Sequence, residues 1–158
     1  MEVKLLRVGF IGAGAIHFGT PMVPWDHASR LEKVGGFEVI GIVDPDQKRA
    51  TMVLQERLSS PHKRQFYQNC QLLSNSDELL NMKPDVVFIG IPPAFRGSLK
   101  QEHDLELRFV EAGIHVFVEK PLSVVPPEEF GLYAEAVRKA VQKHNVILSV
   151  GYMFSYNK

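Results

Sequence analysis

The sequence predicts an α/β protein built on a doubly wound parallel sheet of six strands with flanking helices. Short apolar runs rich in Val, Ile and Phe alternate with longer segments of helical periodicity, which is the pattern of βαβ units. Most runs are continuously apolar, as in strands that helices cover on both faces. The length of 158 residues fits one domain. The expected strands are Leu5–Ile11, Phe37–Val43, Gln65–Tyr67, Val86–Ile91, His115–Val118 and Val146–Val150.

The first two expected helices follow the first two strands. Pro21 and Pro24 delay the first helix, because proline removes a backbone donor and resists the helix interior. We therefore expect it to begin near Asp26 and to end before Gly35, where glycine favours termination. The second helix is expected over residues 46–58.

The remaining expected helices carry capping signals or a clear apolar stripe. A short third helix is expected to begin at Ser76, whose hydroxyl can cap it. The fourth is expected over residues 99–112 and is stopped by Gly113. Pro126 and Pro127 open the fifth, which is the clearest. Its expected buried stripe is Phe130, Tyr133, Ala134, Val137 and Val141.

Composition and charge exclude several classes of protein. Lys and Arg (18) balance Asp and Glu (18), which argues against nucleic acid or an anionic membrane as a partner, since both require a basic surface. The single Cys70 excludes an internal disulfide framework and a Cys-rich metal site, and we assign no metal. The first apolar stretch, residues 5–16, is too short to span a membrane and lacks the features of a signal peptide. We expect a cytoplasmic protein.

A glycine turn directly follows the first expected strand. Gly12 permits a tight turn, and Gly14 lets the backbone approach a pyrophosphate, whose charge then faces the backbone N–H groups that include those of Ala15 and Ile16. His17 stands where the full dinucleotide fingerprint has its third glycine. The turn could serve the fold alone, but its position after the first strand favours NAD binding.

Asp44 follows the second expected strand. A carboxylate at this place can accept hydrogen bonds from both hydroxyls of an adenosine ribose and would repel a 2′-phosphate. The residue could also simply form a turn before Pro45. The charge of Asp44 favours NAD, whereas the nearby Lys48 and Arg49 leave NADP possible.

Glu119, Lys120 and Pro121 follow the fifth expected strand. Ligands of doubly wound sheets bind beyond the carboxyl ends of the strands, so Lys120 is expected to project toward a ligand. Its ammonium could hold a substrate hydroxyl or carbonyl and help to move a proton during hydride transfer. The alternative is an ordinary surface loop.

Several motifs occur together and in order along the chain. They are the glycine turn, Asp44-Pro45-Asp46, Pro92-Pro93, Glu111–Val116, Glu119-Lys120-Pro121 and Val150–Tyr152. In this combination they resemble the cofactor domain of the glucose–fructose oxidoreductase, inositol dehydrogenase and rhizopine (Gfo/Idh/MocA) family. The resemblance covers essentially the whole chain. It implies a Rossmann fold and NAD(P)-dependent oxidation or reduction of a sugar, cyclitol or related polyol, which would be the small-molecule partner.

The resemblance also assigns roles to individual residues. Lys120 matches the active-site lysine, and its bond to Pro121 is expected to be cis. Pro92 and Pro93 match a loop near the nicotinamide and ribose, and Glu119 joins the cofactor-binding set. Arg96 stands where the family often has histidine. Ser155 stands where an arginine is usual.

The resemblance implies a second α/β domain beyond this chain, which would carry the catalytic histidine and most substrate contacts. We expect residues 1–150 to form the cofactor domain and residues 151–158 to begin the linker. A homo-oligomer is expected only through the missing domain. His103 shares an apolar stripe with Leu99 and Leu107, so it could lie near the site or pack in the core.

Two other function classes remain open from the sequence. A non-catalytic dinucleotide-binding regulator could keep the glycine turn and lose turnover. An S-adenosylmethionine-dependent methyltransferase also uses a glycine turn and an acidic residue after the second strand, but has no role for Lys120. Titration with NADH, NADPH and S-adenosylmethionine would separate these classes.

Overall fold

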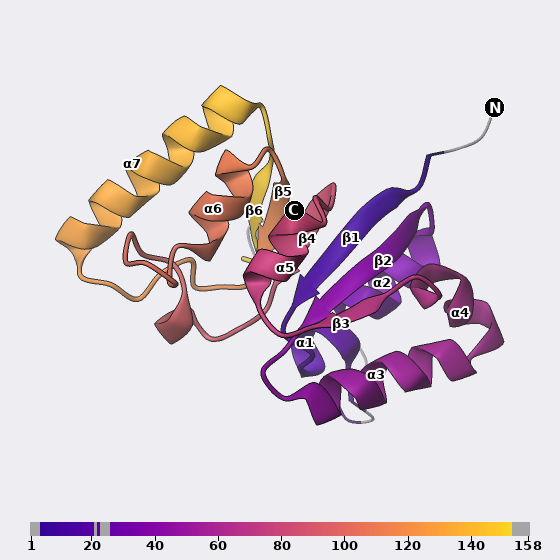
Figure 1. Ribbon diagram of the computed structural model, residues 1–158. Helices are drawn as coiled ribbons and strands as arrows, with labels where there is room; N and C mark the ends of the chain where they lie inside the picture. The colour runs from indigo at the N-terminus through magenta and orange to yellow at the C-terminus, as the bar shows by residue number, and fades with distance from the viewer. Residues whose placement is uncertain (1–3, 21, 23–25, 153–158) are drawn as a thin grey trace. The chain divides into compact units, whose positions relative to one another are not determined.

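The fold is that of a doubly wound, all-parallel α/β sheet, as the sequence predicts. A computed structural model describes residues 4–20, 22 and 26–152. Six parallel strands follow the order β3-β2-β1-β4-β5-β6 (Figure 1), which is the strand order of Rossmann-type sheets. The chain divides into two compact units, residues 1–90 and 91–158, and each is described below by itself.

The first unit holds four strands and five helices among its described residues. Parallel ladders join β1 to β2, β1 to β4, and β2 to β3. In chain order the elements are β1 (Leu6–Ile11), α1 (Ala15–Phe18), α2 (His27–Val34), β2 (Phe37–Val43), α3 (Gln47–Ser59), α4 (Pro61–Tyr67), β3 (Gln71–Leu73), α5 (Ser76–Asn81) and β4 (Val86–Ile89).

The sheet of the first unit is covered on both faces. On one face, Val8 and Phe10 of β1 contact a buried cluster that includes Phe18 of α1, Ala28 of α2 and Ala50 of α3. The other face carries α5, whose Leu79 is fully buried and lies over Gly9 and Gly41 of the central strands. This two-sided cover explains why β1 and β2 are continuously apolar in sequence.

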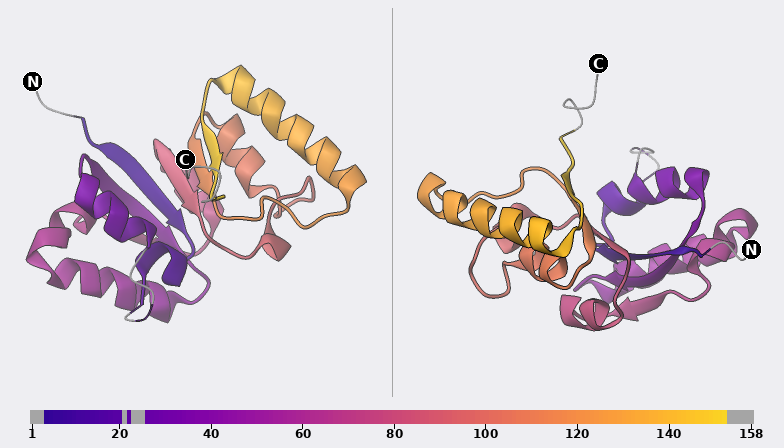
Figure 2. Two further views of the ribbon diagram at one scale, coloured as in Figure 1. Left: turned by 180° about the vertical axis from the view of Figure 1, so that it is seen from behind. Right: turned by 90° about the horizontal axis from the view of Figure 1, so that it is seen from above.

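The second unit contains two strands, two α-helices and one 3-10 turn among its described residues. The elements are a 3-10 turn (Pro93–Phe95), α6 (Leu105–Glu111), β5 (His115–Val118), α7 (Pro127–His144) and β6 (Leu148–Val150). Strands β5 and β6 pair in parallel. Helices α6 and α7 lie side by side (Figure 2), with Phe109 and Val110 of α6 and Tyr133 and Val137 of α7 all buried.

One predicted strand is wrong. Gln65–Tyr67 belongs to helix α4, and the third strand is Gln71–Leu73 instead. Pro61 occupies the first turn of α4, a position that suits proline because its missing N–H has no helical partner there. Phe66 and Tyr67 pack against the core from this helix. A run of three residues is too short to distinguish the two periodicities.

The predicted helix over 99–112 begins later, at Leu105. Residues 99–103 form turns, and Glu102 has a left-handed φ of 70°, which no helix accommodates. Leu99, placed on the expected apolar stripe, is 49% exposed. His103 is half-buried and lies outside the helix.

Helix termini agree better with the sequence than helix lengths do. Asp26 caps α2 as expected, because its carboxylate accepts from the Ser29 N–H at 2.8 Å. Helix α5 begins at Ser76, but the side chain of Asn75 is the cap, not the Ser76 hydroxyl. In α7, Phe130 is 39% exposed instead of buried, since the residues that face α6 start one turn later, at Tyr133.

Several boundaries move by one to two residues. The first strand begins at Leu6, the fourth ends at Ile89 before Gly90, and the sixth begins at Leu148. The one-turn helix α1 was not expected, because only four residues separate the glycine turn from Gly19. Ser155 and most of the expected linker 151–158 lie outside the described residues.

Candidate functional site

In the first unit, the glycine turn has the geometry expected of a ligand-binding backbone. Gly12 adopts φ 103°, a conformation that side chains strongly disfavour, and its N–H bonds the Val43 carbonyl oxygen at 2.7 Å. Gly14 is the N-cap of α1. A Cβ built on Gly14 meets no atom within 4 Å. The first N–H groups of a helix have no partner inside it, so Gly14, Ala15 and Ile16 present donors beside open space.

Asp44 is almost fully buried beside this turn, with 5% of its surface exposed. Its Oδ2 accepts from the Ala13 N–H at 2.6 Å, and its Oδ1 accepts from the Asp46 N–H at 2.8 Å. The carboxylate therefore ties the turn after β1 to the turn after β2. Each carboxylate oxygen has about two acceptor positions, so a further donor on a ligand can still be accommodated.

His17 is fully buried behind the turn. Its Nδ1 lies 2.7 Å from the Gly12 carbonyl oxygen and must donate to it, because a carbonyl oxygen only accepts. Its Nε2 has no hydrogen-bond partner among the described residues. The ring lies over Gly90, where a Cβ would approach Nε2 to 2.5 Å. Because Gly90 has no side chain, the imidazole fits between α1 and the end of β4, and its bond to the Gly12 carbonyl oxygen holds the glycine turn in place.

Burial lowers the pKa of His17 to about 3, although the bond to the Gly12 carbonyl acts in the opposite direction. The unfolded chain binds this proton near pH 6.5 and the folded chain does not, so stability must fall as the pH drops below 6.5. We expect the histidine to contribute about 2 kcal/mol to the loss of stability between pH 7 and pH 5.

Urea unfolding at the two pH values measures this loss. In His17→Asn, which keeps a donor near the Nδ1 position, the loss should shrink by that amount, whereas His62→Asn at an exposed histidine should leave it unchanged. An equal pH dependence in His17→Asn and the unaltered chain would contradict the assignment.

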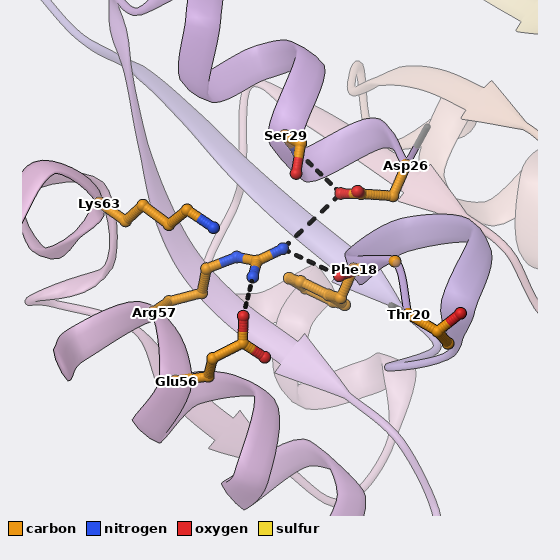
Figure 3. Close-up of a pocket in the computed structure, with 8 residues that line it drawn as sticks. Phe18, Thr20, Asp26, Ser29, Glu56, Arg57 and Lys63 are labelled. Carbon is orange, nitrogen blue, oxygen red and sulfur yellow. Dashed lines mark hydrogen bonds and ion pairs between the residues drawn. The ribbon is translucent and has the colours of Figure 1, made fainter. Parts of the chain in front are cut away.

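A cavity of about 500 Å³ in the first unit, drawn in Figure 3, is lined by none of the predicted site residues. Its central cation, Arg57, is buried and donates to the Phe18 carbonyl oxygen at 3.0 Å and to Glu56 at 2.8 Å. The Asp26 carboxylate lies 3.6 Å from the same guanidinium. The charges that line this cavity compensate one another. The guanidinium also bonds the carbonyl oxygen of Phe18, the last residue of α1, and so fixes the end of that helix.

In the second unit, the Pro92-Pro93 loop leads into a buried arginine. Pro92 is exposed, and Pro93 begins the 3-10 turn that ends at Phe95. The next residue, Arg96, is 1% exposed and bonds the Ile91 carbonyl oxygen through Nε at 3.0 Å. From the sequence, Arg96 is notable only because the family often has histidine at this position. Its burial could not be inferred, because arginine is rarely buried unless paired, and its acidic partner lies on a separate helix.

The loop after β5 carries the predicted lysine. The peptide bond between Lys120 and Pro121 is cis, as the resemblance implies. The Lys120 side chain is exposed, and Glu119 is half-buried. Glu119 lies against Gly151, where a Cβ would come within 3.0 Å of the carboxylate. The ammonium is thus presented to solvent from a loop whose neighbours are tightly packed.

Two groups of predicted site residues emerge, one in each unit. Gly12, Gly14 and Asp44 belong to the first unit, where the Asp44 carboxylate holds the glycine turn through the Ala13 N–H, whereas Pro93 and Lys120 belong to the second. Among the residues that the structure describes, no cluster of three His, Cys, Asp or Glu side chains could hold a metal ion. Within the same residues, no helix is long and apolar enough to cross a bilayer.

Comparison with known families gives one match over nearly the whole chain. A family described as an oxidoreductase family with an NAD-binding Rossmann fold, that of the Gfo/Idh/MocA proteins, matches residues 6–152. The uncharacterized protein UNK4.17 of Schizosaccharomyces pombe is 35% identical over 164 residues, which cover 96% of this chain and 39% of that protein. The chain therefore spans about two fifths of the length of this relative.

Solved structures share the fold at low sequence identity. Myo-inositol 2-dehydrogenase from Lactobacillus plantarum is 23% identical, with a TM-score of 0.69 over 98% of this chain and 38% of that one. A mutant of KijD10, a 3-ketoreductase from Actinomadura kijaniata in complex with TDP-benzene and NADP, is 21% identical, with a TM-score of 0.68 over 97% of this chain and 40% of that one.

Proposed function

The chain belongs to the Gfo/Idh/MocA oxidoreductase family with its NAD-binding Rossmann fold, and from this we propose that it is the cofactor-binding part of an NAD(P)-dependent oxidoreductase acting on a sugar, cyclitol or related polyol. The observation that carries the proposal is the glycine turn. The space beside Gly14 is open, and the side chains of Asp44 and His17 hold the turn in place.

The residues of the first unit would bind the cofactor. The N–H groups of Gly14, Ala15 and Ile16 fit a pyrophosphate, since backbone donors at a helix start favour negative charge. The free acceptor positions of Asp44 fit the hydroxyls of the adenosine ribose. Because these groups are already fixed by hydrogen bonds, little ordering is required when the ligand arrives.

The residues of the second unit would act on the substrate side. We assign Pro92, Pro93 and Glu119 to the nicotinamide end of the cofactor and Lys120 to the oxygen of the reacting carbon. Bound NAD supplies a hydride acceptor. As a C–OH group becomes a carbonyl and its hydride passes to NAD, the neutral Lys120 amine would take up the hydroxyl proton; in the reverse direction the resulting ammonium would donate that proton to the carbonyl oxygen.

The relatives extend over more than twice the length of this chain, so we propose that the substrate is held mainly by sequence beyond Lys158. Residues 1–150 would then form the cofactor domain, and oligomers would form through the additional sequence. We also propose a cytosolic location. Cys70 is the single cysteine of the chain, so the chain can form no internal disulfide, as is usual for proteins of the reducing cytosol.

A titration with NADH, NADPH and S-adenosylmethionine tests the proposal. We expect saturable NADH binding, with a stability gain of about 2.7 kcal/mol at a concentration 100 times the dissociation constant. We expect no polyol-dependent NADH formation from the 158 residues alone, because hydride transfer requires a substrate held against the cofactor. A full-length protein that binds NADH but turns over no polyol would favour the non-catalytic regulator.

The variant Gly14→Ala tests whether NADH binds at the glycine turn. The added methyl meets nothing in the free chain, so folding is preserved, but it occupies the space that the pyrophosphate needs. Gly131→Ala on α7, which also places its methyl in open space, is the matched control. NADH binding by Gly14→Ala as tight as that of the control would place the cofactor elsewhere.

Asp44 is expected to set a preference for NAD over NADP. Its buried carboxylate repels a 2′-phosphate, so Asp44→Ser should narrow or reverse the ratio of the two dissociation constants. The substitution also removes the bond to the Ala13 N–H, so affinity for both cofactors should fall. Fluorescence titration with NADH and NADPH gives the ratio.

Asp46→Asn is the control for Asp44→Ser. It removes one negative charge nearby while an asparagine at the N-cap of α3 can still accept from Arg49. The ratio should change much less than in Asp44→Ser. An unaltered chain that binds NADPH tightly and NADH weakly would overturn the role of Asp44 and point to Lys48 and Arg49.

A further inference from the structure

Arg96 uses every hydrogen-bond donor that a guanidinium has. Besides the Nε bond to Ile91, one terminal nitrogen donates to Glu106 Oε1 at 3.0 Å and to the Leu122 carbonyl oxygen at 3.1 Å. The other terminal nitrogen donates to the carbonyl oxygens of Glu119 at 2.6 Å and Pro121 at 3.1 Å. Five N–H groups are available, and five bonds are formed.

Glu106 neutralises this buried charge. Its Oε1 accepts from Arg96, and its Oε2 accepts from the Gly97 N–H at 3.1 Å and from the Tyr133 hydroxyl at 2.9 Å. Both carboxylate side chain and guanidinium are completely buried. Burial and the neighbouring Glu106 raise the pKa of Tyr133, which therefore remains a donor. The pair is compensated in charge and in hydrogen bonds, as a buried ion pair must be to persist.

The carbonyls that Arg96 bonds belong to the residues on either side of Lys120. Glu119 precedes the lysine, and Pro121 and Leu122 follow it, so the backbone is held before and after the ammonium-bearing residue. The bond to Ile91 fixes the start of the Pro92-Pro93 loop to the same guanidinium. Lys120 itself is exposed and is not among the residues that Arg96 bonds.

We propose that Arg96 is the positioning residue of Lys120: it fixes the loop 119–122 so that the exposed ammonium is delivered in one place for proton transfer. This inference rests on the proposed role of Lys120. A histidine has at most two N–H donors and a lysine three, so neither can hold four carbonyls and a carboxylate in one plane. The arginine therefore performs a task that the family's usual residue cannot.

Gly97 gives the same loop a second, independent constraint. Its φ is 76°, and a Cβ there would collide with the Leu122 carbonyl oxygen and approach the Ser123 Cα to 3.0 Å. The backbone after Arg96 thus touches the backbone after Lys120. A methyl group at position 97 would displace the loop while leaving the guanidinium intact.

The test uses the full-length protein and distinguishes an effect on the position of Lys120 from a general loss of folding stability. Arg96→Lys keeps the charge but loses the fork, and we expect kcat to fall about 100-fold, as a displacement of about 1 Å can cause, with the NADH dissociation constant nearly unchanged. Tyr133→Phe removes one bond to Glu106 and lowers stability without touching the loop, so its kcat should remain that of the unaltered protein. Arg138→Lys, at an exposed arginine of α7, is the matched control.

Hydrogen exchange of residues 119–123 supplies a readout that needs no turnover. We expect exchange at least about 10-fold faster in Arg96→Lys, because several charge-assisted hydrogen bonds to this loop are lost. Gly97→Ala should give the same two effects through displacement of the loop alone, so faster exchange with an unchanged kcat in this variant would overturn the link between loop position and turnover, even if Arg96→Lys does not fold.

Unchanged exchange and unchanged kcat in Arg96→Lys would overturn the positioning role, as would a kcat in Tyr133→Phe that falls equally far. If the unaltered protein neither binds NADH nor oxidises a polyol, the proposed function fails. In that case the exchange rates still decide whether Arg96 holds the loop.

Discussion

In Lys120→Ala, kcat is expected to fall by about 10²–10⁴-fold, the range that a positioned general acid or base contributes. The lysine lies in the second unit, whereas the residues proposed to hold the adenosine and pyrophosphate lie in the first. The NADH dissociation constant should therefore stay within a few-fold of its unaltered value. Steady-state kinetics of the full-length protein with separate NADH titration measure the two quantities.

Lys143→Ala is the control for this result, because Lys143 is an exposed lysine in the last turn of α7. It should change neither kcat nor NADH affinity. A near-normal kcat in Lys120→Ala would show that the residue is part of an ordinary surface loop.

The second large effect concerns stability. Glu106→Gln leaves the Arg96 guanidinium buried without a counter-charge, and breaking such a pair costs about 3–5 kcal/mol. A glutamine also has one acceptor oxygen where glutamate has two, so its amide nitrogen must face either the Arg96 guanidinium or the Gly97 N–H, and both are donors. Urea unfolding followed by circular dichroism should show the midpoint shifted strongly to lower urea.

The exposed pair between Glu135 and Arg138 on α7 is the comparison. Glu135→Gln removes a carboxylate of the same length whose partner remains in water, so the unfolding midpoint should hardly move. Equal shifts for Glu106→Gln and Glu135→Gln would mean that the buried pair contributes no more than a surface pair.

The fold was predictable because its signals are local and repeated. Continuous apolar runs such as Phe37–Val43 identify strands that are covered on both faces, and capping residues such as Asp26 identify helix starts. The predicted strand Gln65–Tyr67 was wrong because a segment of three residues with two aromatic side chains suits a strand and a helix equally. Only the tertiary contacts of Phe66 and Tyr67 decide between the two.

The candidate site was predictable in its residue types but not in its internal bonding. The sequence places Asp44 at a ligand-facing turn, but nothing local shows that Ala13, 31 positions earlier, donates to its carboxylate. The same holds for Arg96, whose bonds reach residues up to 26 positions away. Such contacts depend on how strands and loops meet, which one sequence does not specify.

The packing of His17 over Gly90 has a consequence for how relatives of this chain are recognised. A search that demands three glycines in the first turn rejects the sequence, although the space that the third glycine normally provides is supplied at the end of β4 instead. The two positions should therefore vary together among homologues, with a bulky residue at one accompanied by glycine at the other. A chain with bulky residues at both would have to move the helix away from the strand, and the first turn with it.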